Sequence, residues 1–380
     1  QQRYTTSVHE SRAAIPRFRE ADVLDEQANT LNNLGYVYSV LGHEARAKSL
    51  AEDARQLRER LGQLYPLALS YNTTAEIHTA SNEPEEALAW ADRSRELFTA
   101  MEDARGLGLS YIASGRANRK IGDKGKRGQY PFEKVEHDFQ QAVKWLEKAL
   151  EIFDGDIPTV DEPYRLWESL NELGATYVDW AYLFAWHGLP EEADEKYALS
   201  VDYQKQAVEV AERHGFELQR LDSFDDLAQA YADWGKLEEA KSYLQQIYRT
   251  VPEEYRLVEG QGFREFSDPV DGYWLILGKY YLQRGIWVYR MAESAPDAEE
   301  KDELLDEAVD YFARALAYFR RFSPAQAALD ITTRAMYRRF RSLNLSRLKH
   351  LRKKVQEIAE RYQVDLSRLI DTLDDALGIV

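Results

Sequence analysis

The sequence contains no cysteine, and its 380 residues include only 3 Met and 11 Pro. Without cysteine the chain can form neither disulfides nor thiolate metal sites, so redox chemistry says nothing about its compartment. No uncharged apolar run approaches the roughly 20 residues that a membrane-spanning helix needs, which argues against a membrane protein. The lack of cysteine is compatible with a cytoplasmic location, which we expect, and we expect no membrane contact.

Motifs for catalysis, metal binding and nucleotide binding are also missing. The 7 histidines are scattered and show no HExxH or comparable spacing, so no metal site is predicted. The sequence has no GxxxxGK[ST] phosphate loop, no GxSxG motif and no cysteine nucleophile. We expect no catalytic residue, no cofactor and no enzyme activity. An enzyme of unrecognised type has no support in the sequence and would need turnover by the isolated chain as evidence.

The net charge of −17 is unevenly distributed, because the segment 334–361 is basic while the rest of the chain is acidic. An acidic chain disfavours broad contact with nucleic-acid phosphates, which leaves this segment as the exception. One hypothesis is a regulatory nucleic-acid-binding protein that uses it. The other is a capping helix over Ser346–Gln363 whose charges are simply solvated. The basic residues in question are Arg338, Arg339, Arg341, Lys349, Arg352, Lys353 and Lys354.

A pair that contains a small residue recurs six times along the chain. In the first unit, Leu34, Gly35 and Tyr38 have helical spacing, Gly42 is placed to end that helix, and Ala47 begins the small face of a second helix. A small residue at the contact lets the two helices of a hairpin approach closely. The pattern predicts an all-α array of helical hairpins. The pairs are Leu34-Gly35, Thr74-Ala75, Ser114-Gly115, Leu173-Gly174, Leu227-Ala228 and Leu277-Gly278.

The repeat spacing of about forty residues is broken in several places. We expect insertions at 123–137, where a helix would stop at Gly122, and at 154–163 and 251–271. In the fourth unit the stop glycine comes late, which predicts an elongated hairpin at about 164–214 whose two helices gain two turns each. Such a protrusion would expose aromatic anchors for a partner. The candidate anchors are Trp180, Phe184, Trp186, Tyr197 and Tyr203.

Both ends of the chain fit a repeat array. Residues 1–25 are predicted to be a partial repeat, the second helix of a truncated hairpin, with Pro16 at its end. Residues 323–380 are predicted to form a C-terminal helical cap that includes the basic helix. The three cap helices are expected near 324–342, 346–363 and 366–377. Because the chain starts in mid-repeat, without Met or an apolar signal core, we expect a fragment of a longer protein.

The combination of Leu34-Gly35, Tyr38, Gly42 and Ala47 resembles the tetratricopeptide repeat (TPR). The stretch Thr30–Tyr38 also resembles the repeats of about forty residues in kinesin light chains and in the C-terminal arrays of bacterial signal-transduction (STAND-type) NTPases. The resemblance covers residues 26–322 and implies a right-handed TPR-like superhelical solenoid of about six helical hairpins plus C-terminal capping helices. It implies a protein- or peptide-binding scaffold or sensor from a larger bacterial signalling or defence protein, with an effector or NTPase domain upstream. It leaves the oligomeric state open.

In TPR arrays the first helix of each hairpin lines the concave surface, and this implies a set of partner-binding residues here. Asparagines at the equivalent positions 32, 72 and 171 could donate to and accept from a peptide backbone at once. Alternatively, they are solvated polar residues on a helix face. The groove is expected to be basic in the third unit and acidic in the fourth and fifth. The candidates are Asn32, Tyr36, Asn72, Glu76, Arg116, Arg119, Lys120, Asn171, Asp179, Asp225, Gln229, Asp233 and Lys279.

Overall fold

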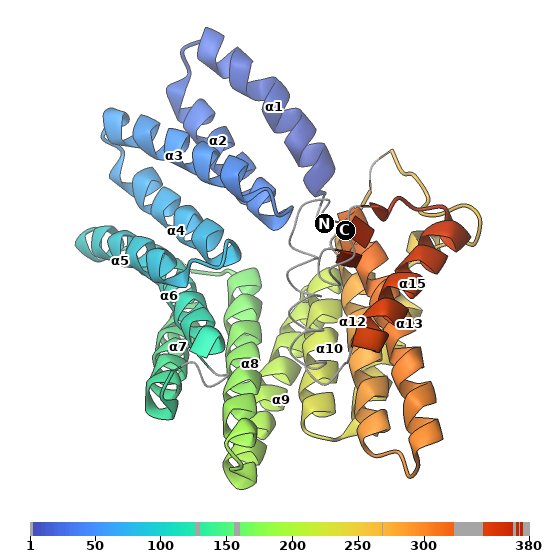
Figure 1. Cartoon of the computed structure of the whole chain (residues 1–380). Helices are drawn as coiled ribbons and strands as arrows, with labels where there is room; N and C mark the ends of the chain where they lie inside the picture. Colours follow the sequence, from blue (N-terminus) through green and yellow to red (C-terminus); the bar gives the residue numbers. More distant parts are fainter. Residues whose placement is uncertain are drawn as a thin grey trace. The chain divides into compact units, whose positions relative to one another are not determined.

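The computed structural model describes residues 3–125, 130–155, 160–267, 269–322, 345–367, 370–371 and 373–374. They fall into an N-terminal unit, residues 4–226, and a C-terminal unit, residues 227–380 together with the first three residues. The described part of the chain is helical without any strand beyond one isolated bridge between Val258 and Gly262 (Figure 1). The prediction of an all-α helical repeat fold is confirmed.

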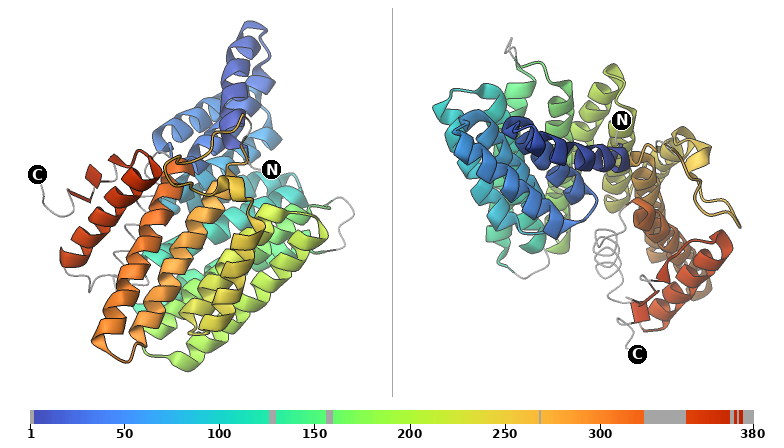
Figure 2. Two further views of the ribbon diagram at one scale, coloured as in Figure 1. Left: turned by 90° about the vertical axis from the view of Figure 1, so that its right-hand side faces the viewer. Right: turned by 90° about the horizontal axis from the view of Figure 1, so that it is seen from above.

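The N-terminal unit is a row of antiparallel helices, and consecutive helices lie side by side in different views (Figures 1 and 2). After α1 the described helices pair as hairpins α2/α3, α4/α5, α6/α7 and α8/α9, and α10 runs on into the C-terminal unit. The bounds are α1 Tyr4–Glu20, α2 Leu24–Val40, α3 Glu44–Leu61, α4 Leu64–Ala80, α5 Pro84–Ala100, α6 Ala104–Gly125, α7 Phe132–Phe153, α8 Pro163–Trp186, α9 Pro190–Arg213 and α10 Glu217–Asp233.

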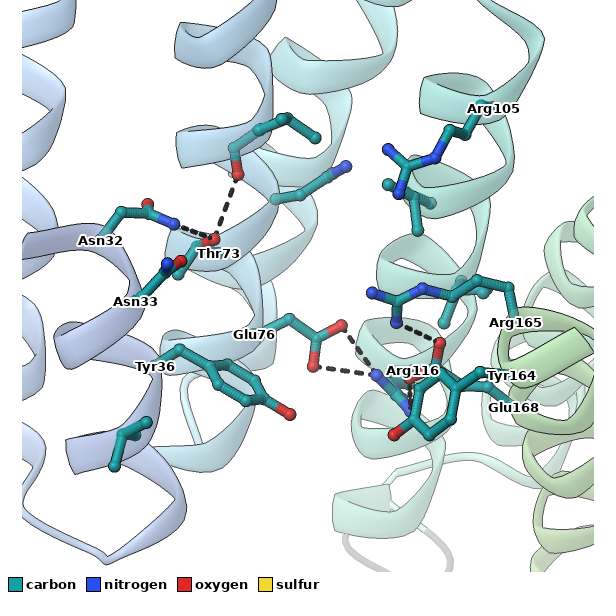
Figure 3. A pocket seen from close by; sticks show the side chains of 15 residues that line it. Asn32, Asn33, Tyr36, Thr73, Glu76, Arg105, Arg116, Tyr164, Arg165 and Glu168 are labelled. Atoms are coloured by element: carbon teal, nitrogen blue, oxygen red, sulfur yellow. Dashed lines mark hydrogen bonds and ion pairs between the residues drawn. The ribbon is translucent and has the colours of Figure 1, made fainter. Parts of the chain in front are cut away.

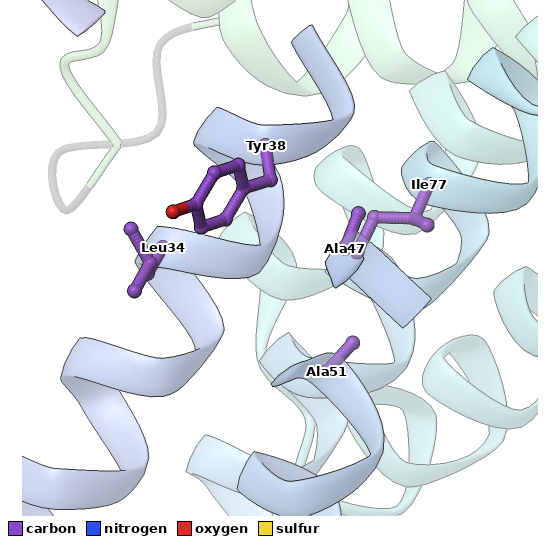
Figure 4. Close-up of a cluster of buried hydrophobic side chains, with 5 residues drawn as sticks. All are labelled: Leu34, Tyr38, Ala47, Ala51 and Ile77. Carbon is purple, nitrogen blue, oxygen red and sulfur yellow. The ribbon is translucent and has the colours of Figure 1, made fainter. Parts of the chain in front are cut away.

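The small pair has the packing role that the sequence predicts. A Cβ atom on Gly35 would lie 3.2 Å from the carbonyl oxygen of Ala47, so α2 and α3 touch almost backbone to backbone. A buried cluster at this contact consists of Leu34, Tyr38, Ala47, Ala51 and Ile77 (Figure 4). Gly42, which follows the C-cap residue Leu41 of α2, has a φ of 75°, a conformation that favours glycine and ends the helix.

Two predicted helix ends in the N-terminal unit are wrong. Gly122 does not stop a helix: it lies inside α6, where a Cβ atom would be 2.9 Å from the ring of Phe139. Residues 132–137, assigned to the insertion 123–137, form the first turns of α7. Pro16 lies inside α1, one turn before the helix ends at Glu20. After Gly122 the helix continues because its next turn still packs on α7, where Gly125 meets Val135, a tertiary effect that local stop signals do not reveal.

The hairpins differ in length. Helices α8 and α9 have 24 residues each, against 17 in each of α4 and α5. Helices α6 and α7 are intermediate, with 22 residues each. The third and fourth hairpins therefore present longer faces than the first two.

The C-terminal unit continues the same construction and ends in a packed helix. The apolar stripe of α15, residues Leu351, Val355, Ile358 and Tyr362, is buried, and α15 packs on α13. The predicted cap helix at 324–342 lies outside the described residues. No helix in the described ranges is long and apolar enough to cross a membrane. The bounds are α11 Leu237–Thr250, η1 Glu253–Tyr255, α12 Gly272–Glu293, α13 Ala298–Phe322 and α15 Leu345–Tyr362.

The connector between α11 and α12 is packed by its aromatic residues. Tyr255 stacks on Phe266 at 4.7 Å between ring centroids, and both rings contact Trp274 at the start of α12. Farther along the connector, the backbone N–H of Gly260 donates to the carbonyl oxygen of Arg361 in α15 at 2.8 Å. The connector therefore ties α15 to the rest of the C-terminal unit.

Candidate functional site

A cavity of about 490 Å³ opens on the N-terminal unit where α2, α4, α6 and α8 face it (Figure 3). These are the first helices of four successive hairpins, the helices that the sequence predicts to carry the binding residues. Five of the predicted residues line it: Asn32, Tyr36, Asn72, Glu76 and Arg116. The other lining residues are Asn33, Val37, Leu69, Thr73, Arg105, Leu109, Ile112, Tyr164, Arg165 and Glu168.

Arg116 is the centre of an ion-pair cluster on the cavity wall. Its guanidinium donates from Nη1 to Glu76 at 2.8 Å, from Nη2 to Glu168 at 2.8 Å and from Nε to Glu172 at 2.7 Å. Two of these carboxylates have a second cation, since Arg165 lies 2.5 Å from Glu168 and Arg119 lies 3.6 Å from Glu172. One side chain on α6 thus connects α4 and α8 across the face of the unit.

The carboxylates of this cluster differ in their acidity. Burial raises the pKa of Glu76; Arg116 opposes the shift, and Glu168 adds to it. The side chain of Glu76 keeps 26% of its surface open to the cavity, but the surrounding walls desolvate the carboxylate. Burial also acts to raise the pKa of Glu172, yet Arg116 and Arg119 outweigh it and lower that pKa to about 2. Arg116 and Arg165 likewise overcome burial at Glu168 and hold its pKa below the usual value.

Replacement of Glu172 by glutamine tests this electrostatic balance. A lowered pKa stabilises the fold above the unfolded value, about 4.3, and this contribution is lost as the pH falls towards 2. Glu76, with its raised pKa, acts in the opposite sense. We expect Glu172→Gln to lower the free energy of unfolding by about 2 kcal/mol at pH 7, and the difference from wild type to shrink between about pH 5 and pH 2.

Urea unfolding at a series of pH values measures this difference. Glu96→Gln, at an exposed position on the outer helix α5, is the matched control and should show no such pH-dependent difference. A constant gap between wild type and Glu172→Gln from pH 7 to pH 2 would mean that Glu172 is not held ionised by Arg116 and Arg119.

The three equivalent asparagines have different surroundings. Asn32 is satisfied internally: its Nδ2 donates to Thr73 at 3.0 Å, and its Oδ1 accepts from Ser70 at 3.2 Å. Asn171 is buried but does not line the cavity. Asn72 lines the cavity and is only 8% exposed, and neither of its amide atoms has a hydrogen-bond partner within the described part of the chain. The three asparagines therefore do not form a ladder along the cavity, and Asn72 is the one of the three that lines the cavity with both amide atoms unpaired among the described residues.

Several residues of the site were missed by the sequence prediction. Each of these residues precedes the small pair of its own helix by five residues or more. They are Arg105 of α6 and Tyr164, Arg165 and Glu168 of α8. The cavity crosses the four helices obliquely, so the later hairpins contribute residues from nearer their N-terminal ends. Glu168 offers the one sequence signal, because a carboxylate between Trp167 and Ser169 on a buried stretch needs a cationic partner.

The other predicted groove residues lie outside the cavity. Arg119 has an ion pair with Glu172 and one with Asp179 at 4.0 Å, so the basic third unit and the acidic fourth unit neutralise each other. The expectation of two separately charged stretches of groove is corrected accordingly. Of the remainder, Lys120 and Asp225 belong to the N-terminal unit, while Gln229, Asp233 and Lys279 belong to the C-terminal unit. Asp233 binds Arg290 at 3.2 Å, and Gln229 accepts from Gln283 at 3.2 Å.

The aromatic residues of the fourth hairpin are mostly core, contrary to the prediction of exposed anchors. Trp180, Phe184 and Tyr197 are buried, and Tyr203 stacks on Tyr177 at 5.6 Å between ring centroids. Only Trp186 of the five is exposed, at 57%. The longer helices have a longer shared face, and the large rings fill it.

The basic segment is partly described. Arg352 binds Asp374 at 2.5 Å, and Lys353 and Lys354 each lie within 4 Å of Glu357. Lys349 is exposed, and Arg338, Arg339 and Arg341 lie outside the described residues. Because Arg352, Lys353 and Lys354 already pair with carboxylates of the same segment, these contacts favour a capping helix over a nucleic-acid-binding one. Nucleic-acid binding stays an untested prediction.

Comparison with known proteins places the chain among helical repeat proteins. Residues 27–61 match the family model described as tetratricopeptide repeat. No curated protein matches the sequence. The structure is similar to that of a Rap protein complexed with Competence and Sporulation Factor, with a TM-score of 0.52 and 14% identity over 98% of this chain and 86% of that one. It is also similar to TPR-like repeats of a kinesin light chain type from Podosopora anserina, with a TM-score of 0.39 and 19% identity over 59% of this chain and 94% of that one.

Proposed function

Since this chain is a tetratricopeptide-repeat protein, we propose that the cavity of α2, α4, α6 and α8 binds an extended peptide segment of a partner protein. The observation that carries the proposal is the unpaired amide of Asn72 in the cavity wall. A buried amide without partners costs about 1–3 kcal/mol, and a ligand in the cavity that hydrogen-bonds to the Asn72 amide would recover this cost. An extended peptide offers both an N–H and a C=O to one carboxamide.

The composition of the cavity wall supports a peptide ligand. Val37, Leu69, Leu109 and Ile112 supply apolar surface, and the other lining residues supply hydrogen bonds and charge. This mixture of apolar surface with a few polar groups is typical of sites that bind small segments. The Rap protein, which shares the fold, was crystallised with a factor bound.

We extend the proposal to the wider role of the chain. It is a non-enzymatic scaffold or sensor segment of a larger bacterial signalling or defence protein, working in the cytoplasm. The support is the resemblance of Thr30–Tyr38 to repeats in such proteins, together with a fold that generally serves as a non-catalytic scaffold. The sequence of the full open reading frame tests this role, because it must encode an effector or NTPase domain upstream.

Peptide selection tests the binding proposal. We expect the chain to enrich sequences from a phage-displayed library of random peptides, and Asn72→Ala to weaken binding of the best synthetic peptide about tenfold or more. Because Asn72 is unpaired in the free protein, the alanine variant should unfold at the same urea concentration as wild type or a higher one. Fluorescence polarisation with a labelled peptide measures the affinity.

The matched control is Gln206→Ala, which removes an amide from the exposed face of the outer helix α9. It should bind the peptide as wild type does. If no peptide is enriched, or if Asn72→Ala and Gln206→Ala bind with equal affinity, the cavity is not the peptide site.

A further inference from the structure

The three carboxylates around Arg116 do not have equal numbers of cationic partners, and Glu76 has the fewest among the described residues. Three carboxylates share the guanidinium of Arg116. Glu168 has Arg165 as a second cation and Glu172 has Arg119, whereas Glu76 makes its ion pair with Arg116 alone within the described residues. Arg116 donates from Nη1 to Glu76 but from its other nitrogens to Glu168 and Glu172, so the one cation that Glu76 has is shared among three carboxylates.

Glu76 is also the carboxylate of this set that a ligand can approach. Its side chain is 26% exposed, against 6% for Glu168 and 12% for Glu172, and it faces the cavity (Figure 3). The raised pKa of Glu76 agrees with its having a single cationic partner, since burial and the neighbouring carboxylate Glu168 both disfavour its charged form. A cation entering the cavity would meet Glu76 before either of the other two carboxylates.

Two aromatic rings stand next to this carboxylate. Tyr36 and Tyr164 point toward one another from α2 and α8, with Glu76 and Arg116 between them (Figure 3). Tyr36 is 43% exposed and Tyr164 36%, but Tyr164 already packs against Arg165, Trp167 and Phe216, so Tyr36 is the ring more available to a ligand. An aromatic face beside a carboxylate is well suited to a guanidinium or ammonium group, which binds both at once.

We infer that Glu76, with the ring of Tyr36 beside it, is the subsite for a basic side chain, arginine or lysine, of the bound peptide. The inference rests on the proposed function, and the unpaired Asn72 in the same cavity points to a ligand independently of the charges. An acidic side chain is disfavoured at this position, because it would meet Glu76 and Glu168 while the nitrogens of Arg116 are occupied. The other two arginines of the cavity, Arg105 and Arg165, already pair with Glu162 and Glu168.

Selected peptides test this subsite directly. We expect peptides enriched on the wild-type chain to share a basic residue at one aligned position. Replacement of an arginine there by citrulline, its neutral isostere, should weaken binding about tenfold or more to wild type and less than about twofold to Glu76→Gln. Glu86→Gln, an exposed acid on the outer helix α5 of the same hairpin, should retain the full citrulline penalty.

The outcomes separate the subsite from the binding site. If citrulline and arginine peptides bind wild type equally, or if the penalty is unchanged in Glu76→Gln, the subsite is wrong, while a loss of binding in Asn72→Ala still upholds the cavity as the peptide site. Enrichment of acidic residues at the aligned position would also overturn it. If no peptide is enriched, both proposals fail. The citrulline comparison on wild type needs no variant, so a folding defect in Glu76→Gln leaves the test intact.

Discussion

Arg116→Ala is expected to lower the free energy of unfolding of the N-terminal unit by about 3–5 kcal/mol at neutral pH, the range for breaking a buried ion pair from one side. The substitution leaves Glu76, Glu168 and Glu172 facing one another without their shared cation. It also removes the side chain that joins α4 and α8 through α6. Hydrogen exchange should therefore accelerate in these three helices more than in α2 or α9.

The penalty of Arg116→Ala has a characteristic pH dependence. Without the guanidinium the three carboxylates take up protons well above the pH at which they do so in the wild type, where Glu172 has a pKa of about 2. The cost should therefore fall as the pH drops below about 5. Arg60→Ala, at an exposed position on α3, is the control and should change stability by less than about 0.5 kcal/mol. A small penalty that is the same at pH 7 and pH 4 would show that Arg116 is not the hub of the cluster.

Gly115→Leu is expected to cost about 3 kcal/mol or more, because it forces a large side chain into the contact between α6 and α7. Even a single Cβ atom at this position would lie 2.5 Å from Cγ of Leu146, which is fully buried. The helices would have to separate, and α7 is fixed on its other side by α8. Thermal unfolding measured by circular dichroism gives the size of the effect.

Two comparisons isolate the cause of the Gly115 effect. Ala89→Leu adds the same branched side chain at an exposed position of α5 and should be nearly neutral. Leu146→Ala opens space opposite Gly115, so Gly115→Ala should cost less in that background than in wild type. Additive costs for Gly115→Ala and Leu146→Ala would contradict a direct contact between the two positions.

Most of the fold could be predicted from the sequence because it is repeated. The small pair with its following alanines fixes where two helices touch, and Gly35 against Ala47 has this contact in the structure. Signals for helix ends were less dependable. Gly42 ends a helix, whereas Gly122 sits inside one because Phe139 needs the space above it. A glycine at a helix end and a glycine at a helix contact look the same in a single sequence.

The candidate site could be predicted only in part. Register from the small pair selects Asn72, Glu76 and Arg116, which line the cavity, because these positions follow the repeat. It missed Arg165 and Glu168, because the cavity runs obliquely and reaches α8 nearer its N-terminal end. The hydrogen-bond partners of the asparagine side chains could not be predicted from the sequence either. Whether an asparagine is paired depends on neighbours in the next hairpin, as Thr73 is for Asn32.

The most direct test of the central claim is photo-crosslinking of a selected peptide to the full chain. Benzoylphenylalanine is placed either at position 33, where Asn33 lines the cavity and is exposed, or at position 186, the exposed tryptophan of the elongated hairpin. We predict an efficient crosslink from position 33, competed by excess unlabelled peptide, and none from position 186. A crosslink from position 186 without one from position 33 would contradict the cavity as the binding site.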